Sequence, residues 1–318
     1  MDFCGVLRLV CLFVNRVIFV LLAIIFGVAA LSLTVFVGTG GPKERLFEIR
    51  SDKNTVLFSV TPWGDPKEVK SAYKPLLKYL SERTGKKFQL LVMDDYDVAI
   101  ENLADGNVDI SVTSPVSYIL AKEREPGLKY ISTIKMEQGR ATYKGYIIAL
   151  KSRYKGMKMG DFLKDASKYD LGFVSKMSAS GWSYPLAMMK EKGVDPFKSF
   201  KSVTVFDNHP DFLTALVDGR VDLGATWEYN LSNAVKRYGN IFEVLWETTP
   251  IPGLTWTASA KVDHGFVDKI RELQLEIESS PRLKEELLKD TPDKGWEVLN
   301  DAFYDEVRGV MKSVAEYK

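Results

Sequence analysis

Three short turns rich in serine and threonine are the parts of this chain best suited to chemistry. They are residues 59–63 (SVTPW), 113–118 (TSPVSY) and 178–183 (SASGWS). Each follows a predicted strand and opens a predicted helix, so it presents unpaired N–H groups, the positive end of a helix dipole and hydroxyl donors. One such turn is typical of ordinary helix capping. Three in one chain leave two interpretations open: ordinary capping, or a site in which several helix starts converge and hold an anion without Arg or Lys.

The sequence lacks the common catalytic and metal-binding patterns. It contains no G-x-G-x-x-G, G-x-x-x-x-G-K-[ST], H-E-x-x-H or G-x-S-x-G motif. Both cysteines, Cys4 and Cys11, lie near the N-terminus, and the two histidines are His209 and His264. The remainder of the chain therefore has no thiol nucleophile, and a His-based metal cluster is not expected. We expect a protein with no enzymatic activity, no cofactor and no metal.

The elements that carry these turns form two successive sets of alternating strands and helices. The first set has predicted strands at 55–60, 88–93 and 108–112 and predicted helices at 65–84, 96–104 and 115–121. The second set has strands at 171–174, 202–205 and 221–225 and helices at 182–192, 210–217 and 227–238. Short apolar runs indicate the strands, and apolar residues three or four apart indicate the helices. This alternation predicts an α/β fold of two lobes with mostly parallel sheets.

Two strand-like runs, 144–151 (KGYIIALK) and 243–249 (EVLWETT), are predicted to carry the chain between the lobes. Lobe one then comprises 55–147 and 247–318, and lobe two comprises 148–246. The C-terminal part, with predicted helices at 267–278, 282–290 and 295–316, contains no new strand–helix set. We expect it to pack back on one of the lobes.

The N-terminal region contains a long apolar segment. Residues 17–38 carry no charge, and at about 1.5 Å per residue a helix of this length crosses a hydrocarbon core of roughly 30 Å. It is either a transmembrane anchor or a signal peptide, and Val28-Ala29-Ala30 offers a cleavage site. The apolar run continues past Ala30 to Gly38, which favours a retained anchor. Residues 1–16 would then be cytoplasmic, and residues 39–54 a tether to the exported lobes.

The balance of positive and negative residues argues against nucleic acid as a partner. Of 318 residues, 46% are apolar, and 43 Lys and Arg stand against 42 Asp and Glu. Without Asp2, Arg8 and Arg16 of the N-terminal segment, the remaining residues carry 41 charges of each sign. Bulk attraction to nucleic acid therefore has no support.

A series of short motifs runs through the chain in one order: 73–76 (YKPL), 79–81 (YLS), 95–96 (DY), 106–110 (GNVDI), 114–118 (SPVSY), 144–146 (KGY), 178–181 (SASG), 208–209 (NH), 218–225 (DGRVDLGA) and 250–252 (PIP). In this order and spacing, residues 54–301 resemble the solute-binding proteins of phosphate/phosphite/phosphonate ABC transporters. The resemblance implies a type II periplasmic-binding-protein fold, in which two α/β lobes close on a ligand about two hinge strands.

The resemblance also implies which residues bind the ligand. In lobe two it points to Ser178, Ala179, Ser180 and Gly181 of the serine turn, and to His209 in the next loop. In lobe one it points to Thr113, Ser114 and Tyr96. Ala179 stands where the family often has a hydroxyl, and Ser114 replaces the usual Gly. Asp222 is expected to be structural, and Trp63 and Trp182 either cap the pocket or only pack.

His209 has two interpretations. A lone histidine in a loop is more often a capping or core residue, whereas its position in the resemblance favours ligand contact. An imidazole with a pKa near neutrality would make binding sensitive to pH. His264 is expected to be a capping or surface residue.

We therefore expect a solute-binding component that captures a small phosphorus oxyanion outside the cytoplasm and delivers it to an ABC permease. The sequence leaves phosphate, phosphite, phosphonate and other oxyanions such as sulfate open. One alternative is a membrane-anchored sensing subunit that binds a different oxyanion for a signalling partner. A transferase on the same two-lobed fold is a further alternative, although no catalytic residues support it.

Overall fold

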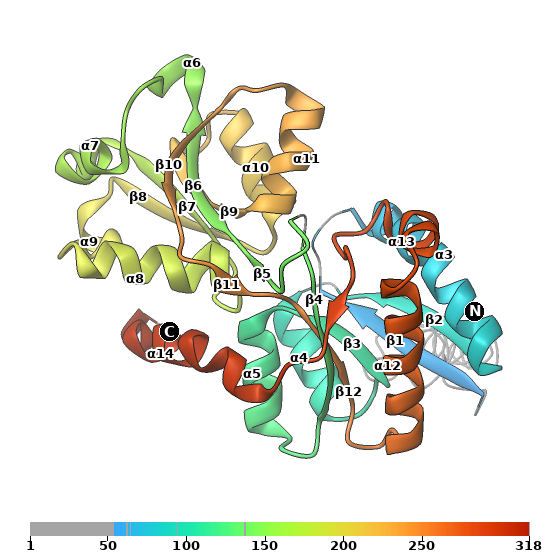
Figure 1. Cartoon of the computed structure of the whole chain (residues 1–318). Helices are drawn as coiled ribbons and strands as arrows, with labels where there is room; N and C mark the ends of the chain where they lie inside the picture. The colour runs from blue at the N-terminus through green and yellow to red at the C-terminus, as the bar shows by residue number, and fades with distance from the viewer. Residues whose placement is uncertain (1–53, 62, 64, 94, 137, 318) are drawn as a thin grey trace, which may run out of the picture. The chain divides into compact units, whose positions relative to one another are not determined.

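The computed structural model describes residues 54–61, 63, 65–93, 95–136 and 138–317, as shown in Figure 1. The predicted segments 1–16 and 17–38, and the predicted tether 39–54 apart from Asn54, lie outside the described residues. Within the described part, no helix is both long and apolar enough to cross a membrane. These residues form two α/β lobes, each built on one main sheet.

Six strands form the sheet of lobe one, in the order β13-β4-β12-β3-β1-β2. Their bounds are β1 (Thr55–Val60), β2 (Lys87–Val92), β3 (Ile110–Thr113), β4 (Lys129–Ile134), β12 (Thr255–Ala258) and β13 (Trp296–Glu297). β1 pairs in parallel with β2 and β3, whereas β12 is antiparallel to β3 and β4. Every residue of β1 is buried, because helices cover both faces of the parallel part of the sheet.

The helices of lobe one are α3 (Pro66–Thr84), α4 (Tyr96–Ala104), α5 (Pro115–Arg124), α12 (His264–Glu278) and α13 (Pro281–Leu288). In Figure 1, α3, α12 and α13 lie together on one side of the sheet, and α4 and α5 form a second group. α3 starts where the Asp65 carboxylate accepts the N–H of Lys67 at 2.8 Å. It ends at Gly85, whose φ of 68° suits glycine.

Five strands form the sheet of lobe two, in the order β10-β6-β9-β7-β8. They are β6 (Gly145–Leu150), β7 (Asp170–Val174), β8 (Ser202–Phe206), β9 (Leu223–Trp227) and β10 (Phe242–Glu247). β7 is parallel to β8 and β9, and β6 is antiparallel to β9 and β10. The helices are α6 (Lys151–Tyr154), α7 (Met159–Lys164), α8 (Tyr184–Glu191), α9 (Pro196–Ser199), α10 (His209–Val217) and α11 (Glu228–Tyr238).

Asp222 has the structural role expected for it. Its carboxylate accepts the N–H of Asp170 at 2.9 Å and the hydroxyl of Tyr154 at 2.6 Å. It also pairs with the Arg153 guanidinium at 2.8 Å. These contacts fix the residue that precedes β9 against the start of β7.

The chain crosses between the two sheets through a short ribbon. This ribbon pairs β5 (Thr142–Tyr143) with β11 (Ile251–Pro252) in antiparallel fashion. The runs 144–151 and 243–249, predicted to make the crossing, instead supply β6 and β10 of the lobe-two sheet. The difference arises because these runs have full antiparallel partners in that sheet, so the crossing is left to the segments 135–144 and 248–254, which pair only at β5 and β11.

The C-terminal segment contacts both lobes. It contains η3 (Asp301–Tyr304), α14 (Asp305–Ser313) and η4 (Ala315–Tyr317). On lobe one, Asp301 accepts the hydroxyl of Tyr118 at 2.8 Å. On lobe two, Val314 joins the apolar cluster around Leu186, and the Lys190 ammonium donates to the carbonyl of Ser313 at 2.6 Å. The segment therefore packs against both lobes.

Candidate ligand-binding site

A small cavity of about 20 Å³ lies between the lobes. Six of its lining residues carry hydroxyl groups, one is a histidine, and none of the described lining residues is an Asp, Glu, Lys or Arg. The lining residues are Thr61, Trp63, Tyr96, Ser114, Tyr143, Ser178, Ser180, His209, Trp227 and Leu254. Polar side chains thus line a small space, and none of its described lining residues brings a formal charge to it.

Five of these residues stand at the beginnings of helices. Tyr96 and His209 are the first residues of α4 and α10, and Ser114 and Trp227 are the N-cap residues of α5 and α11. Ser178 is the N-cap of the turn that leads into α8. Each of these helix starts follows a strand of its own lobe, so the cavity lies at the carboxyl ends of strands in both sheets, where α/β folds bind ligands. The positive ends of several helix dipoles favour an anion there.

The serine turn of lobe two is tightly constrained. The Ser178 hydroxyl accepts the N–H of Gly181 at 3.0 Å, and residues Ala179–Ser183 form one turn of π-helix. A Cβ atom on Gly181 would lie 2.6 Å from the Cβ of Val174. A Cβ on Gly145 would lie 2.8 Å from the Cβ of Ser180. Both positions therefore need glycine for the turn to approach the sheet.

Three predicted site residues do not line the cavity. Ala179 and Gly181 are buried within the turn, which they shape. The Thr113 hydroxyl lies 2.9 Å from the hydroxyl of Thr255 in the neighbouring strand. Ser114, the next residue, does line the cavity, because successive residues of an extended chain point to opposite sides.

Ser114 also joins the two lobes. Its hydroxyl accepts the N–H of Ser117 at 3.1 Å within α5. It lies 3.0 Å from the carbonyl oxygen of Met177, to which it donates across the lobes.

Two tyrosine hydroxyls complete the hydroxyl set. Burial raises the pKa of Tyr96 and of Tyr143 far above the usual value, and hydrogen bonds with Ser178 and Ser180 lower each pKa by less. Both hydroxyls therefore stay protonated at physiological pH and can donate to an anion. Tyr96 was predicted for the site, whereas Tyr143 was not.

His209 is buried at the inner wall of the cavity. Its Nδ1 lies 3.2 Å from the hydroxyl oxygen of Thr226, and its Nε2 lies 3.5 Å from that of Ser178. Burial lowers the pKa of His209 to about 3. The ring is therefore neutral at physiological pH, and the pH sensitivity near neutrality expected from the sequence is not supported. As a neutral ring it offers one N–H donor and one acceptor.

Tryptophan and leucine side chains form the apolar walls. Trp63 packs edge-on against Tyr229 with centroids 5.3 Å apart, and its indole N–H is buried without a hydrogen-bond partner among the described residues. Trp182, the other tryptophan beside a serine turn, packs against Phe173 and does not line the cavity. Trp227 and Leu254 were not singled out for the site. Thr61 was not singled out either, although it lies within the predicted turn 59–63, which was the sequence signal that could have placed it in the site.

The part of the chain that the structure describes contains no group of three or more His, Cys, Asp or Glu residues placed to hold a metal ion. The cavity itself is lined by uncharged hydroxyl groups and a histidine, an arrangement that suits reversible binding of a small anion.

Residues 58–304, more than half of the chain, match the family model of the phosphonate-binding periplasmic substrate-binding proteins of ABC transporters. The chain belongs to this family. The match confirms the resemblance drawn from the ordered motifs. Members of the family are periplasmic substrate-binding proteins of ABC transporters. The chain is accordingly a solute-binding component of an ABC importer and acts outside the cytoplasm.

Individual relatives agree with this assignment. The phosphate-import protein PhnD of Mycolicibacterium smegmatis is 24% identical over 303 residues, which cover 89% of this chain and 92% of that protein. A binding component of an ABC phosphonate transporter from Pseudomonas aeruginosa superposes with a TM-score of 0.74 at 20% identity, over 81% of this chain and 86% of the other. PhnD1 of Prochlorococcus marinus in complex with methylphosphonate superposes with a TM-score of 0.74 at 17% identity, over 83% of this chain and 100% of the other. These structures establish the two-lobed periplasmic-binding-protein fold.

Proposed function

We propose that the protein captures a small phosphorus oxyanion in the cavity between its lobes, with a hydrogen, methyl or hydroxyl substituent on phosphorus. The observation that carries this proposal is the lining of the cavity. Six hydroxyl groups and a neutral imidazole surround it. Of these residues, Tyr96, Ser114, Ser178 and His209 stand at helix starts in both lobes. The related PhnD1 of Prochlorococcus marinus was solved with methylphosphonate, which belongs to this ligand class.

The proposed contacts come from uncharged groups. Ser178, Ser180 and Tyr96 provide hydroxyls, and His209 adds a ring nitrogen. The Ser114 hydroxyl lines the same cavity while it donates to the Met177 carbonyl. Hydrogen bonds between an ionised acceptor and protein donors are stronger than neutral ones, and a water-poor surrounding strengthens them further. A pocket of this kind holds a dianion without a Lys or Arg, as the three serine-rich turns suggested.

The substituent on phosphorus is restricted by the apolar walls. Trp63, Trp227 and Leu254 line the cavity. None of the described lining residues is an Asp or Glu, so no carboxylate there can pair with the ammonium group of an aminoalkyl substituent. A buried unpaired charge is costly. We therefore propose that methylphosphonate, phosphite or phosphate binds more tightly than 2-aminoethylphosphonate.

Ligand entry requires the lobes to separate. A volume of about 20 Å³ holds little more than one water molecule, which is less than a tetrahedral oxyanion needs. We propose that residues 55–147 with 247–318 and residues 148–246 move as two lobes of a type II binding protein. The ribbon β5–β11 is the proposed hinge, because it lies in the two segments that join the sheets and has only two paired residues in each strand.

We further propose that residues 17–38 anchor the protein to the cytoplasmic membrane beside an ABC permease. The uncharged run supports an anchor of this length. Alkaline extraction of membranes tests it: an anchored protein stays in the membrane fraction, whereas a processed protein begins after Ala30 and is released.

Calorimetric titration tests the ligand proposal. The purified protein is titrated with phosphate, phosphite, methylphosphonate, 2-aminoethylphosphonate and sulfate. We expect binding of the first three and a loss of about 10-fold or more in Ser178→Ala, where a donor to a charged ligand is removed. Ser183→Ala in the same turn is the matched control, because Ser183 is buried but does not line the cavity. Tight binding of sulfate alone, or of none of the five, would overturn the proposal.

A further inference from the structure

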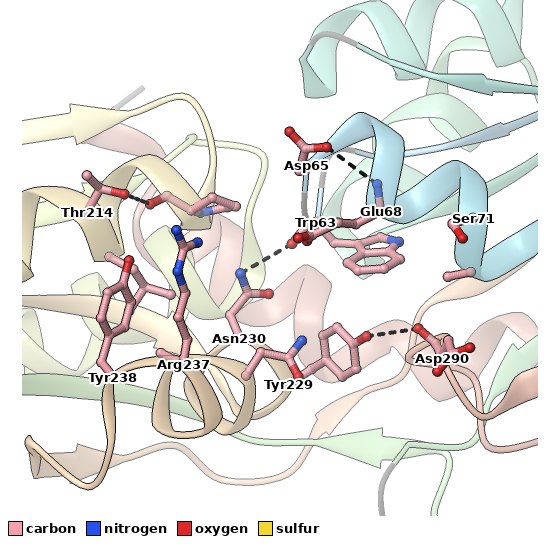
Figure 2. A pocket seen from close by; sticks show the side chains of 15 residues that line it. Trp63, Asp65, Glu68, Ser71, Thr214, Tyr229, Asn230, Arg237, Tyr238 and Asp290 are labelled. Atoms are coloured by element: carbon pink, nitrogen blue, oxygen red, sulfur yellow. Dashed lines mark hydrogen bonds between the residues drawn. The ribbon is translucent and has the colours of Figure 1, made fainter.

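A second hollow lies between the lobes, beside the cavity. It is a groove of about 530 Å³, shown in Figure 2, to which lobe one contributes Trp63, Asp65 and Glu68 and lobe two contributes Tyr229, Asn230 and Arg237. Trp63 lines both the groove and the small cavity. The groove therefore adjoins the cavity at this tryptophan.

Asn230 links the walls of the cavity across the lobe boundary. Its side-chain oxygen accepts the indole N–H of Trp227 within lobe two. Its side-chain nitrogen donates to the backbone carbonyl of Trp63 in lobe one at 3.2 Å, the contact drawn in the centre of Figure 2. The orientation of the amide is fixed by chemistry, because an indole N–H only donates and a carbonyl only accepts. Asn230 is 6% exposed.

Both partners of this amide are cavity walls. Trp227 belongs to lobe two and Trp63 to lobe one, so the two hydrogen bonds of one side chain hold the opposing walls together. The contact joins residues on different lobes, so we expect it to break when the lobes separate. Neighbouring contacts act in the same place: the Tyr229 ring packs on Trp63, and its hydroxyl donates to the carbonyl of Asp290 at 3.3 Å.

We propose that Asn230 is a closing latch: a positioning residue that retains the ligand by fixing Trp63 and Trp227 together, and whose release opens the cavity toward the groove. The inference rests on the proposed ligand-binding function. It predicts that Asn230 controls the rate of ligand release without touching the ligand.

Asn230→Asp tests the latch sharply. The substitution keeps the size of the side chain and the oxygen that accepts from Trp227. It replaces the donor that faces the Trp63 carbonyl with an acceptor, so the closed state loses its bond and gains a repulsion. The first turn of a helix favours a carboxylate, so α11 itself is not weakened. Asn233→Asp is the matched control, because Asn233 lines the groove from the same helix and has no hydrogen bond to lobe one among the described residues.

Stopped-flow tryptophan fluorescence with methylphosphonate, and separately with inorganic phosphate, provides the measurement. We expect the dissociation rate constant of Asn230→Asp to rise about 10-fold or more, with a small change in the association rate constant. Asn233→Asp should stay close to the wild type. Asn230→Ser loses the hydrogen bonds to Trp227 and to Trp63 without adding charge, so it should also release ligand faster. This variant replaces Asn230→Asp in the test if the aspartate variant does not fold.

A pH profile separates the latch from a merely structural role. A protonated carboxyl at position 230 regains a donor toward the Trp63 carbonyl. The ratio of dissociation rates between Asn230→Asp and the wild type should therefore fall as the pH is lowered toward about 5, whereas the ratio for Asn230→Ser should stay constant. The titration of the ligand and of the surrounding charged groups affects all three proteins alike, so it cancels in these ratios. These groups are Asp65, Glu68, His209, Glu228, Arg237 and Asp290.

The outcomes are distinct. Wild-type binding together with unchanged release from Asn230→Asp and Asn230→Ser overturns the latch and leaves the proposed function intact. The same holds if Asn233→Asp releases ligand as fast as Asn230→Asp. Wild-type binding of neither methylphosphonate nor phosphate overturns the proposed function, and the latch with it.

Discussion

Tyr143 of the crossing ribbon and Ser180 of the serine turn line the same cavity, and the serine side chain is near enough to lower the pKa of the tyrosine. Tyr143 belongs to β5 and is paired with Ile251 of β11, whereas Ser180 lies in lobe two. The Tyr143 ring also packs edge-on against Trp227 at a centroid distance of 5.7 Å. A rotation of the ribbon therefore changes the position of a cavity hydroxyl, so the proposed hinge and the proposed binding site are mechanically connected.

Tyr143→Phe removes this hydroxyl and keeps the packed ring. We expect the affinity for methylphosphonate to fall about 5- to 10-fold, because one hydrogen bond near a charged ligand is lost. Calorimetric titration checks this change. Tyr238→Phe is the control, because Tyr238 lines the groove but not the cavity. Equal losses in the two variants would contradict a specific role of Tyr143.

Gly181→Ala tests the tight approach of the serine turn to β7. The added Cβ would lie 2.6 Å from the Cβ of Val174 and 2.9 Å from the hydroxyl oxygen of Ser178. We expect the free energy of unfolding to drop by about 1–3 kcal/mol through overpacking, together with a loss of ligand affinity. Urea unfolding measures the first effect.

The control for that change is Gly160→Ala in α7, where an added Cβ meets nothing within 4 Å. Alanine there should raise the free energy of unfolding by about 0.5–1 kcal/mol, because it is the better helix former. A destabilisation of the same size at both positions would argue against steric crowding at Gly181.

Much of the fold was predictable from local signals. The helix expected at 65–84 is observed at Pro66–Thr84, because Asp65 and Gly85 mark its ends in the sequence. Strand β12 (Thr255–Ala258), in contrast, was missed. It has four residues, and its place is set by antiparallel pairing with β3 and β4, more than a hundred positions away. Such pairing leaves no local pattern.

The residues of the candidate site also fall into those with a local sequence signal and those without one. Ser114, Ser178 and Ser180 were found because a strand, a hydroxyl-rich turn and a helix follow each other in the sequence. Tyr143 and Leu254 reach the cavity only through the crossing ribbon and the sheet order. The pKa of His209 also depends on surroundings from several elements, so the sequence alone suggested a pH response that burial removes.

The buried His209 makes stability depend on pH. Its pKa is lowered from 6.5 to about 3 by burial, so between these values the unfolded chain binds a proton that the folded chain does not. The free energy of unfolding therefore falls as the pH drops below about 6.5. Relative to His209→Gln, the wild type should lose about 2–3 kcal/mol between pH 7 and pH 4.5, as measured by urea unfolding. His264→Gln, an exposed change, is the control, and parallel curves for wild type and His209→Gln would contradict the prediction.

Asp293 should show the opposite dependence in an overlapping range. Burial raises the pKa of Asp293 to about 6, while hydrogen bonds from Tyr73 at 2.9 Å and from Trp256 at 3.3 Å oppose the shift. The folded chain therefore binds a proton more readily than the unfolded chain, whose carboxyl titrates near 3.8. The stability contributed by the protonated carboxyl is present below about pH 4 and is lost as the pH rises through about 6.

Relative to Asp293→Asn, the wild type should therefore lose about 2 kcal/mol of unfolding free energy between pH 4 and pH 7 and change little above it. Asp290→Asn, an exposed neighbour, is the matched control for the loss of a carboxylate. The difference curves for Asp293→Asn and His209→Gln should slope in opposite directions between pH 4.5 and 6, because one group is held protonated by burial and the other deprotonated. Curves of the same slope would contradict either the lowered pKa of His209 or the raised pKa of Asp293.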